Sequence, residues 1–271
     1  MIIDAHHHLL TEPGYLDRLV ASCRKLSIDK VCLFGAGRQF LQYGIANNSE
    51  VFAAKEACPD LIVPFAVFEL GKDNPCLIDE FAHQGFKGVK FINPTKNYDD
   101  REFYPVYGRI EAHGIPALFH LGIVSRGPSD RYYDIDNNRH RPIYLDTIAR
   151  AFPDLTVIGA HLGNPWYPEA AMACRWNPNL YFDLSGSTLK KKSPQALGEL
   201  LWWTPTSRYK DPHGRHAWEK IVFGSDVAAD EIEDVWNDYN RVMDALNLAP
   251  EIRRNVMGGT MAKLLKLDES R

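Results

Sequence analysis

Short runs of apolar and β-branched residues alternate with longer stretches of helical periodicity along the whole chain. The short runs predict strands, because nearly continuous apolar character is typical of strands that are covered on both faces of a parallel sheet. The predicted strands are Ile2–His6, Lys30–Phe34, Ile62–Phe68, Gly88–Ile92, Ile115–His120, Thr156–His161, Leu180–Leu184 and Ile221–Asp226. The helical stretches between and after them include Tyr15–Leu26, Cys76–Gln84, Phe103–His113, Ile143–Phe152, Pro168–Arg175, Pro194–Trp202, Glu231–Leu246 and Pro250–Leu267.

Alternating strands and helices predict an α/β protein, and eight such units favour closure of the parallel sheet into a (β/α)₈ TIM barrel. An open, doubly wound sheet is the alternative. Dinucleotide binding by such a sheet requires a glycine-rich turn after the first strand, where histidines stand instead. The 271 residues are close to the roughly 250 that one barrel uses. We therefore expect a single domain over residues 1–271.

Composition narrows the class of protein. Hydrophobic residues make up 45% of the chain and charged residues 24%, as in ordinary globular proteins, and the net charge of −4 argues against nucleic-acid binding. No apolar run approaches the roughly 18 residues that a membrane span needs. The five cysteines are scattered without a CxxC pair, which argues against a disulfide framework and a thiolate zinc site. Because no apolar leader precedes the histidines near Met1, we expect a cytoplasmic protein.

Candidate chemistry begins in the first predicted strand, which leads into three consecutive histidines. Strand side chains alternate between the two faces, so His6 and His8 should point to one side and His7 to the other. Two imidazoles on one face at the end of a strand can hold a metal ion. We expect His7 to point into the layer between strands and helices and to form local hydrogen bonds.

Three other predicted strands also end in residues that can bind a metal: His120, His161 and Asp226. Burying such groups at the tip of an apolar strand is costly unless each has a partner. A single histidine there is usually a hydrogen-bonded core residue, but four strands with such tips favour a common site. Neutral imidazoles with one carboxylate suit Zn²⁺, Fe²⁺ or Mn²⁺.

With these motifs the sequence resembles the amidohydrolase superfamily, in particular its amidohydrolase-related branch. That branch includes aminocarboxymuconate semialdehyde decarboxylase and related lactonases and hydratases. The matching motifs are Ile3-Asp4-Ala5-His6-His7-His8, Gly85-Phe86-Lys87-Gly88-Val89-Lys90, Phe119-His120, Gly159-Ala160-His161-Leu162-Gly163 and Phe223-Gly224-Ser225-Asp226. The tail from Gly258 to Leu265 resembles the closing helix of the family.

The resemblance implies a distorted (β/α)₈ barrel with one divalent metal ion at its C-terminal mouth. His6, His8, His120 and Asp226 match the ligands of that ion, for which Zn²⁺ is expected first and Mn²⁺ or Fe²⁺ are alternatives. Asp226 also matches a general acid/base. His161 matches a residue that either binds a second metal or works as a general acid/base beside the first. The resemblance also allows a homodimer.

Two reactions fit such a site. One is hydrolysis of a small carboxylate, lactone or amide by a metal-activated water, and the alternative is non-oxidative decarboxylation of an aromatic or enoic acid. A non-catalytic barrel that keeps the ligands for structure or metal storage is disfavoured by the complete ligand set. We expect a small-molecule substrate, with neither nucleic acid nor a membrane as partner. The long connections Leu121–Pro142 and Ser185–Trp218 follow strand ends and should wall the mouth.

Two basic residues are candidates for binding the substrate. Lys90 should face away from Val89 and Phe91, and it can bind a substrate carboxylate, form a structural ion pair, bridge two metals after carboxylation, or lie at the surface. Arg38 follows Gly35-Ala36-Gly37, where its guanidinium can bind a substrate carboxylate through two hydrogen bonds. An ordinary surface arginine is the alternative for Arg38.

Overall fold

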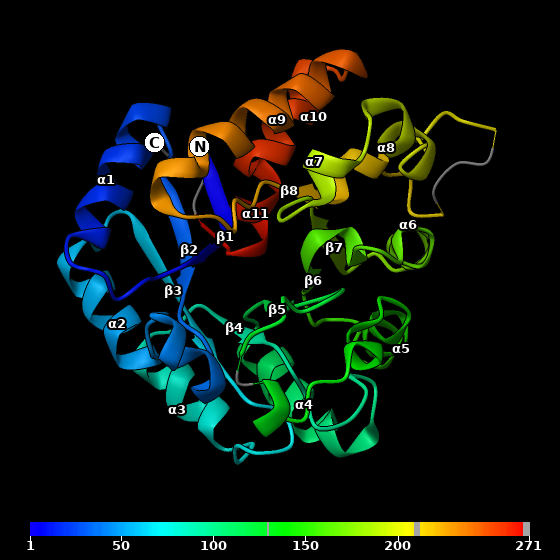
Figure 1. The fold of residues 1–271 in the computed structure, drawn as a ribbon. Coiled ribbons are helices and arrows are strands. Elements are labelled where there is room, and N and C mark those ends of the chain that lie inside the picture. Colours follow the sequence, from blue (N-terminus) through cyan, green and yellow to red (C-terminus); the bar gives the residue numbers. More distant parts are fainter. Residues whose placement is uncertain (129, 209–211, 268–271) are drawn as a thin grey trace.

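The computed structural model describes residues 1–128, 130–208 and 212–267, and within these ranges eight parallel strands form one sheet in chain order (Figure 1). They are β1 (Ile3–His8), β2 (Lys30–Phe34), β3 (Ile62–Val67), β4 (Gly88–Phe91), β5 (Ala117–Phe119), β6 (Val157–Gly159), β7 (Leu180–Asp183) and β8 (Ile221–Val222). The predicted α/β class and (β/α)₈ barrel are confirmed.

The seam between β8 and β1 nearly closes the barrel through contacts that lie around the strand ends. The amide of Ala5 donates to the carbonyl oxygen of Phe223 over 2.8 Å, and the amide of Asp226 donates to that of His6 over 2.7 Å. The carboxylate of Asp4 also accepts hydrogen bonds from the amide and hydroxyl of Ser225, at 2.9 and 2.6 Å. The seam therefore brings Asp226 beside the histidines of β1.

Helices connect the strands and cover the outside of the barrel (Figure 1). They are α1 (Tyr15–Leu26), α2 (Asn48–Ala57), α3 (Leu77–Gln84), α4 (Tyr104–His113), α5 (Ile143–Ala151), α6 (Tyr167–Trp176), α7 (Thr188–Lys191), α8 (Pro194–Leu200), α9 (Ile232–Ala245), α10 (Pro250–Arg254) and α11 (Thr260–Leu264). The predicted helices did not include α2, although it begins with a capping box between Asn47 and Glu50 that is a recognisable start signal.

The predicted helix Pro250–Leu267 is wrong as a continuous element. The structure divides it into α10, a π-helical turn at Asn255–Gly259, and α11. The backbone at Gly258 packs directly on the start of β1, where a Cβ atom would lie 2.5 Å from the carbonyl oxygen of Met1. Close packing against the barrel, which local periodicity does not reveal, interrupts the helix.

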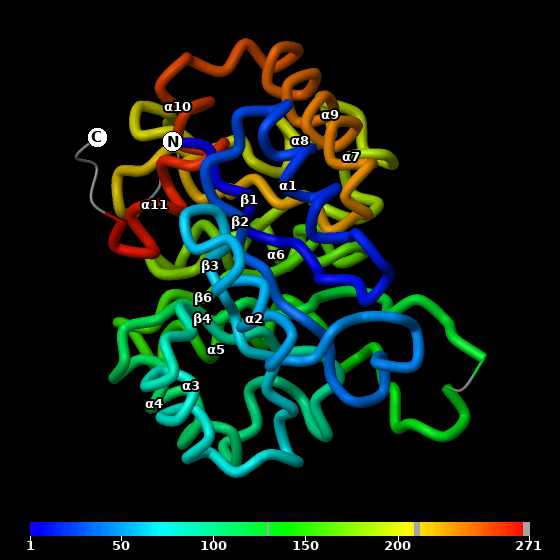
Figure 2. Tube along the Cα trace, turned by 90° about the vertical axis from the view of Figure 1, so that its left-hand side faces the viewer, coloured from blue at the N-terminus to red at the C-terminus, as the bar shows by residue number. Residues whose placement is uncertain are grey.

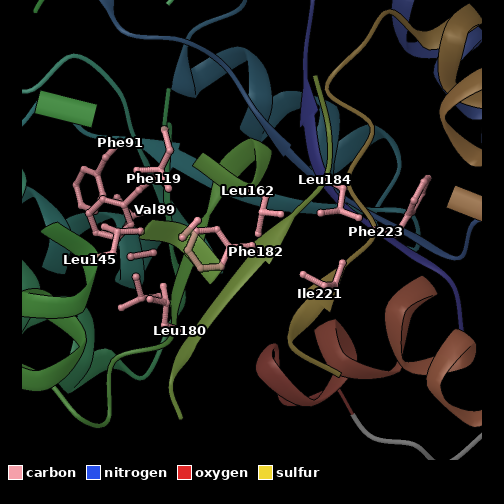
Figure 3. Packing of buried hydrophobic residues seen from close by; sticks show 14 of the residues in the cluster. Val89, Phe91, Phe119, Leu145, Leu162, Leu180, Phe182, Leu184, Ile221 and Phe223 are labelled. Atoms are coloured by element: carbon pink, nitrogen blue, oxygen red, sulfur yellow. The ribbon is translucent and has the colours of Figure 1, made fainter. Parts of the chain in front are cut away.

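Two apolar clusters follow from the alternation of side chains along the strands. Residues such as Phe91, Phe119 and Phe182 belong to the outer cluster, which fills the space between strands and helices (Figure 3). The inner cluster includes Phe34 and Phe65 and extends to Met261 and Ala262 of α11. The C-terminal helix thus contributes apolar side chains to the core inside the barrel.

The end of the barrel opposite α11 is its mouth, where the strands have their C-terminal ends and the polar candidate side chains lie. In Figure 2 the N-terminus and α11 lie on the left, whereas the loop after β5 projects on the right, beyond the C-terminal ends of the strands. Of the two long connections predicted to wall this mouth, residues 129 and 209–211 lie outside the described residues. Among the helices that the structure describes, none has the length and apolar character to cross a membrane.

Candidate metal centre

Three imidazoles converge on the carboxylate of Asp226 at the C-terminal mouth. The Oδ1 atom of Asp226 lies 3.4 Å from His6 Nε2 and 3.6 Å from His8 Nε2. Its Oδ2 atom lies 3.5 Å from His161 Nε2. Two nitrogen or oxygen ligands of one tetrahedral zinc ion are themselves roughly 3.3 Å apart. The separations in this cluster are therefore close to those of atoms that share an ion.

His120 borders this cluster. Its ring centroid lies 5.2 Å from that of His161, and its Nε2 atom is buried without a hydrogen-bond partner. Among the described residues, the two groups of closely spaced metal-binding atoms are His6–His8–Asp226 and His6–His161–Asp183, and His120 is in neither. The structure thus brings together three of the four predicted ligands and places the fourth next to them with an unsatisfied nitrogen.

A bulge in β1 turns both predicted ligands toward the mouth. The pairing register of β1 with β2 shifts between Asp4 and His7. Ile3 and Ala5 pack inside the barrel, so strict alternation would turn His6 outward. The extra residue of the bulge allows His6 to face inward as well, and His8 follows it.

His161 and Asp226 do not lie on the strands predicted for them. The strands β6 and β8 end earlier, and both residues occupy turns with left-handed backbone, at φ values of 61° and 48°. This conformation costs about 1–3 kcal/mol for a residue other than glycine and is concentrated at functional sites. The two turns aim the side chains across the mouth.

The hydrogen bonds of the imidazoles define which ring nitrogens face Asp226. His6 Nδ1 lies 2.8 Å from Asp183 Oδ2, and His8 Nδ1 lies 2.8 Å from the carbonyl oxygen of Gly35. Because a carboxylate and a carbonyl only accept hydrogen bonds, both rings carry their proton on Nδ1 and turn a lone pair at Nε2 toward Asp226. Burial lowers the pKa of His8 to about 3, so this ring is neutral at pH 7. Facing acceptors at these distances fit a cation between them.

The two acidic residues of the cluster differ in their free lone pairs. Asp183 accepts four hydrogen bonds, from His6 Nδ1, the amides of His161 and Ser185, and the Ser185 hydroxyl. Three of these bonds fall on Oδ1 and one on Oδ2, so both oxygens are already engaged within the protein. Asp226 accepts no side-chain hydrogen bond from the described residues and stays available. Sequence reasoning missed Asp183, although a carboxylate at the end of an apolar strand is the same signal that singled out Asp226.

The two basic candidates lie in different places. Lys90 is 1% exposed, and its Nζ atom lies 3.0 Å from His6 Nε2 and 4.9 Å from the centroid of the Phe34 ring. Burial lowers the pKa of Lys90 to about 8. The side chain of Arg38 is 74% exposed and pairs with Asp73 at 2.8 Å and Glu69 at 3.4 Å. The structure brings Lys90 into the cluster and places Arg38 in a surface ion-pair group.

His7 points away from the cluster, as alternation predicts. It is fully buried, its Nδ1 atom lies 2.8 Å from Ser225 Oγ, and its Nε2 atom lies 2.9 Å from the hydroxyl of Tyr15. The ring therefore connects β1 to α1 and to the turn after β8, outside the barrel.

Comparison with known proteins identifies the class to which this barrel and its cluster belong. Residues 3–267 match the model of the amidohydrolase family, and the chain belongs to that family. Comparison with curated protein sequences finds no match. Enzymes of the family include hydrolases and decarboxylases, and they typically depend on a metal.

Several solved structures share the fold. An uncharacterised TIM-barrel protein from Bordetella bronchiseptica superposes with a TM-score of 0.72 at 20% identity, covering 98% of both chains. A probable 2-pyrone-4,6-dicarboxylic acid hydrolase from Acinetobacter baumannii, with citric acid bound, gives 0.65 at 13% identity, covering 98% of this chain and 99% of the other. A 5-carboxyvanillate decarboxylase from Sphingomonas paucimobilis gives 0.65 at 14% identity with the same coverage. These likenesses concern the fold alone.

Proposed function

We propose that this protein is a metal-dependent hydrolase that acts on a small carboxylate, lactone or amide. One divalent ion would be held by His6, His8, His120 and Asp226, with Zn²⁺ expected first and Mn²⁺ or Fe²⁺ as alternatives. The observation that carries the proposal is the convergence of acceptor atoms on Asp226, beside the buried and unpartnered Nε2 of His120. A divalent ion would give His8, His120 and Asp226 a shared partner, next to Lys90 Nζ, which lies 3.0 Å from His6 Nε2.

The charges of the site favour an anionic substrate. The centre contains a buried carboxylate, Asp183, a half-buried one, Asp226, and the ammonium of Lys90. The three charges sum to minus one, and a divalent ion would make the sum plus one. We therefore propose that Lys90 binds a carboxylate of the substrate. Arg38 is a second candidate for this role, and it would have to leave Asp73 and Glu69 to take it up.

The two oxygens of Asp226 suit different tasks. Oδ1 faces His6 and His8 and would act as the ligand atom, whereas Oδ2 faces His161 and would accept a proton from the attacking water. His161 Nε2 is near enough to Oδ2 to pass that proton to the leaving group. When bound, the ion would polarise a substrate oxygen and make water more acidic.

The test compares metal content with turnover in two variants. Purified protein is stripped of metal, reloaded with Zn²⁺, Mn²⁺ or Fe²⁺, and assayed with lactones, amides and aromatic carboxylates. His161→Ala should keep its metal and lose roughly 10²–10⁴-fold in kcat, the usual contribution of a general acid/base. Asp226→Asn should lose both its metal and its turnover. Asp146→Asn on α5, which pairs with Arg150 away from the centre, serves as the control.

Three results would overturn parts of the proposal. Release of CO₂ from aromatic carboxylates without hydrolysis of any ester or amide would favour the decarboxylase. Loss of half the metal in His161→Ala would indicate two ions and make Lys90 the suspected bridge. Near-normal turnover in both variants would show that the site is misassigned.

A further inference from the structure

We infer that Asp183, acting together with Ser185, positions two different imidazoles, His6 and His161, by determining which ring nitrogen of each carries the proton. The tasks of these imidazoles rest on the proposed function, but their protonation pattern does not. Asp183 lies at the end of β7, His6 in β1 and His161 in the turn after β6. One carboxylate would thus prepare both a metal ligand and a proton-transfer residue.

The contact between Asp183 and His6 is a direct hydrogen bond. Asp183 Oδ2 lies 2.8 Å from His6 Nδ1. Both side chains are buried, so water does not compete for this bond. The carboxylate can only accept, and His6 must therefore donate from Nδ1 and keep its lone pair on Nε2, where Lys90 Nζ lies 3.0 Å away. This is the arrangement in which an imidazole binds a metal through Nε2.

The contact between Asp183 and His161 passes through the hydroxyl of Ser185. Ser185 Oγ lies 2.5 Å from Asp183 Oδ1 and 2.9 Å from His161 Nδ1. Ser185 donates its single hydroxyl hydrogen to the carboxylate, because the carboxylate has no hydrogen of its own to donate. The serine oxygen must then accept from His161 Nδ1. The lone pair of His161 is left on Nε2, the atom that faces Asp226.

The surroundings hold this arrangement in place. Asp183 Oδ1 also accepts from the backbone amides of His161 and Ser185, both at 2.9 Å, and these bonds prevent the carboxylate from rotating. The backbone at two glycines also packs closely against these side chains. A Cβ atom at Gly224 would lie 3.1 Å from Asp183 Cβ, and one at Gly186 would lie 3.0 Å from His161 Nδ1.

The chain offers a matched control with the same chemistry. Ser225 Oγ donates to Asp4 at 2.6 Å and lies 2.8 Å from His7 Nδ1, which forms a second carboxylate–serine–imidazole unit at the seam of the barrel. This unit meets His6 only at its backbone, where the amide donates to Asp4 at 3.1 Å and the carbonyl oxygen lies 3.4 Å from Ser225 Oγ. Ser225→Ala removes an equally buried hydroxyl and should change the ring of His7 alone.

Asp183→Asn has a predictable effect on His6. The two backbone amides require the amide oxygen of the asparagine at the Oδ1 position, so its NH₂ group must face His6 Nδ1. That group donates, and His6 must move its proton to Nε2, where it blocks metal binding. We expect zinc affinity to fall by roughly 10–100-fold, as for other residues that orient a metal-binding histidine.

The experiment records nitrogen-15 NMR spectra of the histidine rings in the full-length, metal-free protein at neutral pH, together with zinc affinity by competition with a chelator. In the wild type, His6 and His161 should both be protonated on Nδ1. Asp183→Asn should shift His6 to the Nε2-protonated form. Ser185→Ala should change His161 only and leave the zinc affinity near that of the wild type.

The outcomes separate this inference from the proposed function. Unchanged ring spectra of His6 and His161 in a folded Asp183→Asn protein would overturn the inference. If that variant does not fold, an unchanged His161 in Ser185→Ala overturns it instead. A wild type with the expected ring spectra but no zinc binding would contradict the proposed function and support the inference.

Discussion

Replacing His7 by alanine should destabilise the barrel and leave metal binding intact. The imidazole is fully buried and hydrogen-bonds to Ser225 and Tyr15, so its removal loses two hydrogen bonds worth about 1 kcal/mol each. The cavity left by the ring adds a cost of about 2–3 kcal/mol. Ser225 retains Asp4 as an acceptor and Tyr15 retains the carbonyl of His8, which limits the further penalty. We expect the free energy of unfolding to fall by about 4–5 kcal/mol.

Urea unfolding followed by circular dichroism measures this change. A chelator must be present, because a bound ion would add its own stabilisation. His113→Ala is the control, since this exposed histidine pairs with Asp79 on the surface and should cost less than about 1 kcal/mol. His8→Ala should show the opposite pattern, with zinc lost and a smaller change in stability. A folded His7→Ala protein that binds no zinc, or one as stable as the wild type, would refute the reasoning.

Three further predictions follow from individual contacts. Burial lowers the pKa of His140 from 6.5 to about 4, so the unfolded chain binds a proton that the folded one does not, and stability should fall by up to about 3 kcal/mol as the pH drops through this window. His140→Gln should flatten that part of the urea-midpoint curve, and equal slopes would contradict the assignment. Gly224→Ala places a Cβ atom 2.8 Å from that of His6, so we expect the free energy of unfolding to fall by about 1–3 kcal/mol and zinc to bind more weakly. A normal melting temperature and a normal metal content would show that the strands move apart easily. Deletion of Tyr132–Asn138, which are exposed or half-buried, should impair KM or kcat with little change in melting temperature; unchanged kinetics would mean that this loop does not wall the site.

Local sequence patterns were sufficient to predict the barrel. The length and apolar character of the runs identify all eight strands, and the predicted helix Tyr15–Leu26 agrees with α1 at both ends. These features depend on residues within a few positions of one another, because burial on both faces of a strand requires a continuous apolar run. Local alternation also predicts that the side chains of His6 and His8 point to one side of the strand and that of His7 to the other.

Only the tertiary structure decides the inward direction of His6. Alternation relates neighbouring side chains but does not say which face meets the barrel interior once a bulge intervenes. That bulge arises in the pairing of β1 with β2. Likewise, Arg38 was a reasonable candidate by its glycine-rich surroundings, and its carboxylate partners Glu69 and Asp73 come from the next strand–helix connection.

The protonation of the imidazoles is the property furthest from the reach of sequence patterns. Asp183 is separated from His6 by 177 residues, and their hydrogen bond exists because β1 and β7 contribute to the same mouth. A histidine becomes a ligand, a base or a core residue according to what its second nitrogen meets. The residue types follow from the sequence, whereas their roles depend on partners that only closure of the barrel brings within hydrogen-bonding distance.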